Sequence, residues 1–359
     1  MMLDVDSLTH RYGAETAVDD VSFGIERGEL VALLGPSGCG KTTIVQAIAG
    51  HVSPATGRIC LRGEDVTDRP PEARQVGVVF QQPTLYPHMT VGENVAYGLR
   101  AQGIEPPRRD ELVGEYLSLV SLETQREAYP VELSGGQRRR GELARALAPQ
   151  PDVLLLDEPL SALDRSLRTR LRDEIARIQR ETGVTTLYVT HDQSDAMALA
   201  DRLLVMNEGQ IAGRGRPRTL YESPPTPFVA SFLGRSNAVS ATVVDREPPT
   251  LALGEATITL PETGTDVPVG TTVTCHIRPE HLTLRSSGGE DRSLTATVDR
   301  VADVGSRYDV TVTLPGGEEL VVERRGDPPA AGERVSVEFS AARTVLFTGG
   351  ERADRAPQV

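Results

Sequence analysis

The feature that most constrains the fold is a glycine-rich segment at residues 35–42, which fits the pattern G-x-x-x-x-G-K-[ST]. An apolar run at residues 30–34 precedes it, and a helical pattern at residues 44–50 follows it. A strand, a glycine loop and a helix in this order form a phosphate-binding loop, because the glycines turn backbone N–H groups inward and the helix adds its positive N-terminus. The chain is therefore expected to contain an α/β P-loop domain that binds a nucleotide.

This loop supplies most of the candidate nucleotide contacts. Lys41, the only lysine in the chain beside 37 arginines, would place a point charge against the β- and γ-phosphates. The Thr42 hydroxyl is a candidate ligand for Mg²⁺. The alternative, a glycine-rich turn with an exposed lysine, is disfavoured because strand, spacing and helix agree. The other candidate contacts in the loop are Gly35, Pro36, Ser37, Gly38, Cys39, Gly40 and Thr43.

A second strand end carries two carboxylates. Residues 153–158 read Val-Leu-Leu-Leu-Asp-Glu, which predicts a buried parallel strand with acids at its carboxyl end. We expect Asp157 to face the magnesium ion and Glu158 to polarise a water molecule for in-line attack on the γ-phosphate. Two solvated acids would be the default for such a strand end by itself. The P-loop favours the catalytic interpretation.

Between these elements, residues 133–137 read Leu-Ser-Gly-Gly-Gln, and a basic helical run at residues 138–147 follows. A serine and two glycines at a helix start can form a second anion site, although alone they would be an ordinary helix cap. With this pentapeptide the chain resembles the ATPase subunits of ATP-binding cassette (ABC) transporters. The resemblance implies that Ser134, Gly135, Gly136 and Gln137 grip the γ-phosphate of ATP bound by the opposite subunit of a dimer.

The resemblance also assigns roles to four single residues. Tyr12, expected just before the first strands, matches the aromatic residue that stacks on adenine; an exposed turn tyrosine is the alternative. Gln81, at the end of a strand over 76–80, matches the glutamine that touches Mg²⁺ and the attacking water. Asp164 ends a Ser-Ala-Leu-Asp loop similar to the one that crosses the dimer interface. His191 matches the histidine that contacts the γ-phosphate.

The strand pattern around His191 supports its assignment, although a lone histidine at a strand end is usually structural. Residues 168–182 have helical spacing between the apolar segments at 153–156 and 185–190. The two strands should therefore lie side by side, with Glu158 and His191 at one sheet edge. One departure from the family follows the pentapeptide, where residues 138–143 read Arg-Arg-Arg-Gly-Glu-Leu instead of a glutamine and an apolar turn. It concerns the packing of that helix rather than the phosphate contact.

We expect two domains and a short tail. Residues 1–235 would be the ABC nucleotide-binding domain, with a helical subdomain at about 88–150, and residues 351–359 a tail. Residues 236–350 alternate Val and Thr strands with Gly and Pro turns, and a sequence echo links 241–246 with 296–300. This pattern predicts a small all-β barrel of OB type. The phrase Ile-Arg-Pro-Glu at 277–280 resembles the C-terminal TOBE extension of importer-type ATPases, for which we expect a regulatory or dimer-bracing role, with a bound small ligand as the alternative.

Charge and apolar content exclude several classes of protein. The chain has 51 acidic and 38 basic residues, a net charge of −13, which argues against nucleic-acid binding. Its longest apolar runs fall far short of the ~20 residues of a membrane span, and its amino terminus lacks the features of a secretory signal. Three cysteines at unrelated spacings indicate neither disulfides nor a zinc site.

The resemblance as a whole implies the ATPase of a binding-protein-dependent importer, peripheral on the cytoplasmic face of the cell membrane, with ATP and Mg²⁺ as cofactors. Its implied partners are a second copy or a paired ATPase subunit, two transmembrane permease subunits and, indirectly, an extracytoplasmic substrate-binding protein. Residues 82–91 are the expected docking patch, exposing Leu85, Tyr86 and Met89, unless this segment is a core-packed loop. A non-transport ABC ATPase of DNA repair or translation is the alternative function. Polyamines, ferric iron, sulfate and sugars fit about equally as the transported solute.

Overall fold

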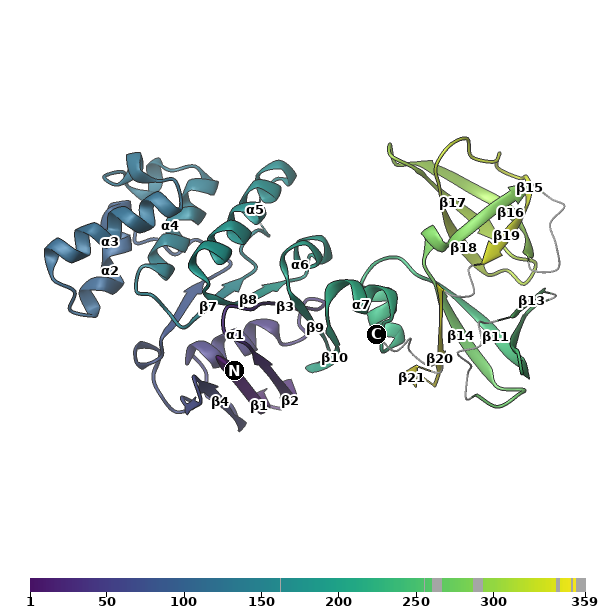
Figure 1. The fold of residues 1–359 in the computed structure, drawn as a ribbon, viewed down its shortest axis with the longest axis horizontal. Coiled ribbons are helices and arrows are strands. Elements are labelled where there is room, and N and C mark those ends of the chain that lie inside the picture. The colour runs from purple at the N-terminus through teal and green to yellow at the C-terminus, as the bar shows by residue number, and fades with distance from the viewer. Residues whose placement is uncertain are drawn as a thin grey trace. The chain divides into compact units, whose positions relative to one another are not determined.

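The computed structural model describes residues 1–161, 163–254, 256–259, 267–286, 293–339, 343–349 and 351–352. The chain divides into two compact units, residues 1–217 and 218–359 (Figure 1). This division falls earlier in the chain than the predicted domain boundary at residue 235, which stays a prediction.

A parallel sheet forms the centre of the first unit. Its strand order is β10-β9-β3-β8-β7-β6, and only β10 runs antiparallel to its neighbour. All residues of β3, β7 and β8 are buried, because helices and a second sheet leave neither face to water. The predicted strands are thereby confirmed, and their carboxyl ends meet at one edge. The strands are β3 (Leu30–Leu34), β6 (Val76–Val79), β7 (Val153–Asp157), β8 (Thr185–Thr190), β9 (Arg202–Asn207) and β10 (Gln210–Gly215).

An antiparallel sheet of order β2-β1-β4-β5 packs with the parallel sheet and α1 (Lys41–Ala49) around one apolar core. Tyr12 pairs with Glu15 at the β1–β2 turn, so it ends the first strand. The expectation that it precedes the first strands is wrong, since the hairpin pairing continues to the turn. The strands are β1 (Leu3–Tyr12), β2 (Glu15–Ile25), β4 (Thr56–Leu61) and β5 (Glu64–Asp65).

Helices occupy the remainder of the first unit, and three of them fall within the predicted helical segment at 88–150. Of these, α2 contacts both α3 and α4. Capping boxes at Thr90 and Ser134 begin α2 and α4. The helices are α2 (Val91–Ala101), α3 (Pro106–Leu119), α4 (Gly135–Leu147), α5 (Arg165–Thr182) and α6 (Gln193–Leu199), with 3₁₀ turns at Pro71–Ala73, Glu123–Gln125 and Pro130–Glu132.

The second unit is all-β beyond the short helices α7 (Pro217–Glu222) and α8 (Pro227–Phe232) and one 3₁₀ turn (Pro279–His281). Its described strands form two antiparallel sheets of order β13-β12-β11-β14-β20-β21 and β15-β19-β16-β17-β18, whose side chains share one core. The all-β character is confirmed, and the OB-type arrangement stays a prediction. The strands are β11 (Asn237–Arg246), β12 (Pro249–Leu253), β13 (Ala256–Thr259), β14 (Thr272–Ile277), β15 (Leu282–Ser286), β16 (Ser293–Asp303), β17 (Tyr308–Thr313), β18 (Glu319–Arg324), β19 (Arg334–Phe339), β20 (Thr344–Thr348) and β21 (Glu351–Arg352).

The sequence echo corresponds to a structural repeat within this unit. The echoed segments lie on β11 and β16. Strand β11 pairs with β12 and β14, and β16 pairs in the same way with β17 and β19. One half of the repeat runs from β11 to β15 and the other from β16 to β20. The last strand of each half pairs with a strand of the other half, since β15 pairs with β19 and β20 pairs with β14. Each sheet therefore contains strands from both halves of the repeat.

Arg278, from the Ile-Arg-Pro-Glu phrase, ties the helical segment to the β-strands of the second unit. Its side chain is 5% exposed and donates hydrogen bonds to the carbonyl oxygens of Tyr221, Ala230 and Gly234. The guanidinium also lies 4.1 Å from the centre of the Tyr221 ring. These contacts explain why α8 belongs to the second unit.

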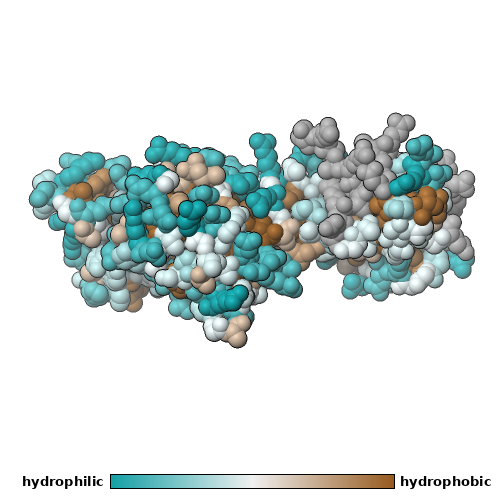
Figure 2. All heavy atoms as spheres, turned by 90° about the horizontal axis from the view of Figure 1, so that it is seen from below, coloured by the Kyte–Doolittle hydropathy of each residue, from teal (hydrophilic) through white to brown (hydrophobic). Residues whose placement is uncertain are grey.

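On the face seen in Figure 2, hydrophilic residues dominate among those that the structure describes, and hydrophobic ones form small patches. Among the described residues, no helix combines the length and the apolar character needed to cross a membrane.

Candidate nucleotide-binding and catalytic site

The P-loop joins β3 to α1 at the carboxyl edge of the parallel sheet. Gly38 and Gly40 have φ values of 83° and 100°, which disfavour any side chain. A Cβ at Gly40 would also lie 2.3 Å from the carbonyl oxygen of Ala17. No side chain caps α1, so the N–H groups of its first turn are left for a ligand.

Lys41 lies across this loop with 6% of its surface exposed. Its Nζ donates hydrogen bonds to the carbonyl oxygens of Gly35 and Pro36, each at 2.9 Å. Cys39 lies beside it, with its Sγ 3.9 Å from Nζ, and burial raises the pKa of the thiol. The lysine is therefore held at the loop, and burial opposes ionisation of the neighbouring cysteine.

Asp157 ends β7 opposite the start of α1. Burial, followed by the charge of Glu158, raises its pKa, and a hydrogen bond from the Thr42 side chain opposes this shift. Its Oδ1 is buried and has no hydrogen-bond partner. An unpartnered carboxylate oxygen next to a hydroxyl suits Mg²⁺, which takes one or two protein oxygens and completes its shell with phosphates and water. Within the described part of the chain, no group of three His, Cys, Asp or Glu side chains offers an all-protein metal cage.

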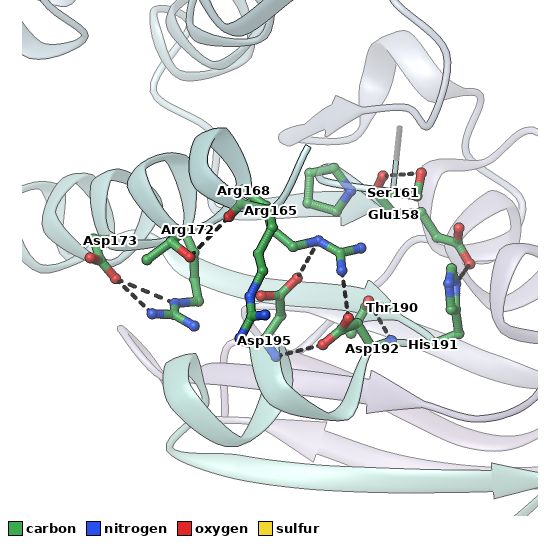
Figure 3. A network of polar contacts seen from close by, with 12 residues as sticks. Glu158, Ser161, Arg165, Arg168, Arg172, Asp173, Thr190, His191, Asp192 and Asp195 are labelled. Atoms are coloured by element: carbon green, nitrogen blue, oxygen red, sulfur yellow. Dashed lines mark hydrogen bonds and ion pairs between the residues drawn. The ribbon is translucent and has the colours of Figure 1, made fainter. Parts of the chain in front are cut away.

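Glu158, His191 and Gln81 come together at the same edge, although 77 residues separate Gln81 from Glu158. The Glu158 Oε1 lies 2.9 Å from His191 Nδ1, and its Oε2 accepts a hydrogen bond of 3.2 Å from Gln81 Nε2. Figure 3 shows the histidine ring directed at this carboxylate. The structure thus brings together the three residues that sequence reasoning named as catalytic.

The backbone at Glu158 is itself fixed. This residue has a φ of 45°, its N–H donates to the carbonyl oxygen of Val189 on the neighbouring strand, and its carbonyl accepts from the Ser161 hydroxyl. The left-handed conformation turns the chain sharply after Asp157. The two successive carboxylates therefore point in different directions, Asp157 toward Thr42 and Glu158 toward His191.

Sequence reasoning missed an arginine that braces the segment after His191. Arg168, on the first turn of α5, pairs with Asp192 at 2.6 Å and with Asp195 at 3.4 Å (Figure 3). Asp192 also caps α6 by accepting from the N–H of Asp195. An acid directly after the histidine and a second acid three residues later are the sequence signal for this brace.

The signature residues occupy the start of α4. The Ser134 hydroxyl accepts a hydrogen bond from the N–H of Gln137, and the Gln137 side chain accepts one from the N–H of Ser134. Ser134 and Gly135 are exposed, and a Cβ on Gly136 would lie 3.0 Å from Leu167 of α5. The helix start is thus packed against α5 and open to solvent at its tip.

Two further candidates have local partners in this chain. Asp164 caps α5 by accepting from the Leu167 N–H, the Ser166 hydroxyl and the Ser166 N–H, and these bonds lower its pKa. Tyr12 is 50% exposed, and its hydroxyl lies 3.4 Å from Gln46 Oε1. Both side chains lie at the surface, and their roles in nucleotide contact stay predictions.

The expected docking patch is less exposed than predicted, because Leu85 is buried and Tyr86 and Met89 are only partly exposed. Leu85 is 8% exposed, so the expectation of an exposed Leu85 is wrong. Gly141 of α4 makes room for it, since a Cβ there would lie 3.3 Å from the leucine. Buried Asn94 pins the rest of the loop by bonding to the backbone of Tyr86, Met89 and Thr90.

Two models of known protein families match this chain. The ABC transporter family model matches residues 18–161, and the TOBE domain model matches residues 275–347. The chain belongs to the ABC transporter family, as an importer-type ATP-binding subunit with a TOBE domain, and it is an ATPase.

Individual relatives resemble almost the whole chain. It is 44% identical over 342 residues to the spermidine/putrescine import ATP-binding protein PotA of Acidothermus cellulolyticus, covering 90% of this chain and 87% of that protein. It is 43% identical over 317 residues to the Fe(3+) ions import ATP-binding protein FbpC of Photorhabdus laumondii, covering 88% of each. The solved structure of cbiO1 from Clostridium perfringens, part of the ABC transporter complex cbiONQ, matches 62% of this chain and 91% of its own length, with a TM-score of 0.58 and 28% identity.

Proposed function

We propose that this chain powers solute import by hydrolysing Mg-ATP at sites shared between two copies. Each ATP would lie between the P-loop of one copy and residues 134–137 of the other. The observation that carries the proposal is the convergence of Gln81 and His191 on Glu158 at the P-loop edge. The exposed, lysine-free start of α4 has the hydroxyl and N–H groups that a second phosphate contact requires.

Hydrolysis would use the residues of the carboxyl edge in separate roles. Glu158 accepts the proton of the attacking water, Gln81 orients that water, and His191 holds the γ-phosphate while its Nδ1 stays on Glu158. Lys41 leaves its carbonyl partners for the β- and γ-phosphates. Thr42, Asp157 and Gln81 would hold Mg²⁺, whose positive charge would offset the negative charge that develops on the phosphates. Tyr12 would stack on adenine, and Asp164 would face the partner copy.

The proposed assembly places this chain as a peripheral subunit on the cytoplasmic face of the membrane, beneath two permease subunits. Support comes from relatives named as import ATP-binding proteins and from a structural neighbour in a transporter complex. The 82–91 loop, with exposed Gln82, Pro87 and His88, is the proposed docking surface. ATP binding would close the two copies and hydrolysis would reopen them, while the TOBE unit braces or regulates the dimer.

A mixing experiment tests the shared site. Lys41→Ala removes one half of each site and Ser134→Arg blocks the other half, so each variant alone should be inactive. A mixture should regain hydrolysis, because its heterodimer contains one site with an intact P-loop and an intact signature. An inactive mixture in which heterodimers are demonstrated by affinity tags would contradict the proposal.

A second measurement addresses closure. Glu158→Gln retains the shape of the site without the base, so ATP should accumulate unhydrolysed and hold two copies together during size-exclusion chromatography. Adding Ser134→Arg to the same chain should abolish that dimer. A Glu158→Gln variant that stays monomeric with Mg-ATP, even with its permease partners, would refute closure by ATP.

A further inference from the structure

Three polar side chains on one face of α4 are directed into the protein. Arg139, Glu142 and Arg145 follow one another at intervals of three residues, a spacing that places them on neighbouring positions of a helix surface. Arg139 and Glu142 are 7% and 1% exposed and form an ion pair of 2.7 Å. A buried ion pair is retained only where additional hydrogen bonds satisfy both partners. These two residues are part of the departure from the family pattern that follows the signature.

The hydrogen bonds of Arg139 reach both sides of the catalytic cluster. Its Nη1 donates to the carbonyl oxygen of Phe80 at 2.6 Å, directly before Gln81. Its Nε donates to the carbonyl oxygen of Pro159 at 2.6 Å, and its Nη2 lies 3.4 Å from that of Glu158. One planar guanidinium therefore touches the main chain beside both Gln81 and Glu158.

Glu142 and Arg145 connect the same helix face to the loop after Gln81. Glu142 accepts a 2.5 Å hydrogen bond from the N–H of Thr84 through its second oxygen. Arg145 donates to the Thr84 carbonyl and hydroxyl oxygens, each at 2.6 Å, and lies over the Tyr86 ring. A displacement of residues 84–86 would thus be transmitted through Glu142 to Arg139.

We infer that the Arg139–Glu142 pair is a positioning unit for ATP hydrolysis, which sets Gln81 and Glu158 relative to each other and links them to the 82–86 loop. The guanidinium is rigid and its donors are fixed in one plane, so its two short carbonyl bonds fix the spacing between the Gln81 and Glu158 main-chain segments. A misplacement of about 1 Å in a catalytic group can reduce a rate roughly 10²-fold. This inference rests on the proposed role of Glu158 as the base.

Two double variants that differ in a single hydrogen-bonding group test the inference. Arg139→Met with Glu142→Gln removes both charges and all donors at residue 139, whereas Arg139→Gln with Glu142→Gln restores a donor in a side chain of nearly the same size. We expect the first to lower kcat by roughly 10- to 100-fold with KM for Mg-ATP within about twofold of wild type. The second should hydrolyse ATP about tenfold faster than the first. Equal kcat values in the two variants would overturn the inference, as would a loss confined to KM.

A matched pair at the other end of the sheet serves as the control. Arg202 pairs with Glu29 at 2.8 Å and also donates to the Gly24 carbonyl, beside the amino ends of β9 and β3. Arg202→Met with Glu29→Gln should lower Tm but leave kcat unchanged below the melting transition. If the Arg139→Met double variant does not fold, the single variant Glu142→Gln tests the inference instead. It should lower kcat at least about threefold with unchanged KM, and a wild-type kcat would overturn the inference.

The failure of this inference is distinguishable from failure of the proposed function. Hydrolysis by Glu158→Gln at the wild-type rate would contradict the proposed base. If instead Glu158→Gln is inactive and the two double variants match each other, only the positioning role is refuted.

Discussion

Two glycine-rich helix starts in the first unit, α1 and α4, satisfy their N–H groups in opposite ways. The start of α1 has left-handed glycines, a buried lysine and no side-chain cap. The start of α4 closes a capping box on itself, which occupies the N–H groups of Ser134 and Gln137. An uncapped helix start beside a lysine can bind phosphate unaided. A self-capped start without a lysine offers fewer free N–H groups and no positive side chain, so we expect it to contribute little to phosphate binding by the isolated chain, in agreement with its proposed contact to the partner's ATP.

The largest expected difference between the two starts is in nucleotide affinity of the isolated chain. Lys41→Ala should weaken ATP binding by about 1.5 to 3 kcal/mol, because a charge-assisted phosphate contact is lost, and should abolish hydrolysis. Ser134→Ala should leave binding by the isolated chain within about twofold of wild type. Equilibrium titration with ATP checks both variants. Equal losses in the two variants would remove the distinction between the helix starts.

Glycine replacements give a smaller and more local contrast. Gly40→Ala should lower the free energy of unfolding by about 1 to 3 kcal/mol, because its φ is left-handed and the Ala17 carbonyl occupies the space of a Cβ. Gly135→Ala should change that free energy by less than about 0.5 kcal/mol, since the space that a Cβ would occupy there is open. The same variant should nevertheless lose hydrolysis, because the methyl group occupies the surface that the partner's phosphate approaches. Denaturant titrations and ATPase assays together test this contrast, and an unstable Gly135→Ala protein would contradict it.

The smallest effect concerns the acid opposite α1. Asp157→Asn should stabilise the nucleotide-free protein by about 1 kcal/mol at neutral pH, since it removes a buried negative charge that lies close to Glu158, while Mg²⁺-dependent hydrolysis is lost. The folded state raises the pKa of Asp157, so the wild type is penalised above that pKa and the penalty disappears as pH falls below the ordinary aspartate range. Thermal unfolding of both proteins between neutral and acid pH measures this difference. A stability gap that widens in acid would contradict the assignment.

Local sequence patterns were sufficient for the parts of the site that lie at strand ends. Apolar runs ending in Asp157, Glu158 or His191 predict parallel strands, and the carboxyl ends of parallel strands necessarily meet. The contacts of Arg139 could not be predicted in this way, because its acceptors are main-chain carbonyls that look identical at every position of a sequence. The burial of Leu85 depends on the space left by Gly141, on a helix that is distant in the sequence. The glycine within that helix is the one sequence feature that indicates this space.

The pairing of β15 and β20 with strands of the other half has a consequence for biosynthesis. The edge of β14 stays unpaired until β20, near the carboxyl end of the chain, has left the ribosome. A nascent or prematurely terminated chain that ends before residue 344 would therefore expose a row of free N–H and C=O groups, which is a template for aggregation. The solubility of the second unit should consequently depend on synthesis of β20, whereas the P-loop unit, whose described strands all lie before residue 216, is free to fold while synthesis continues.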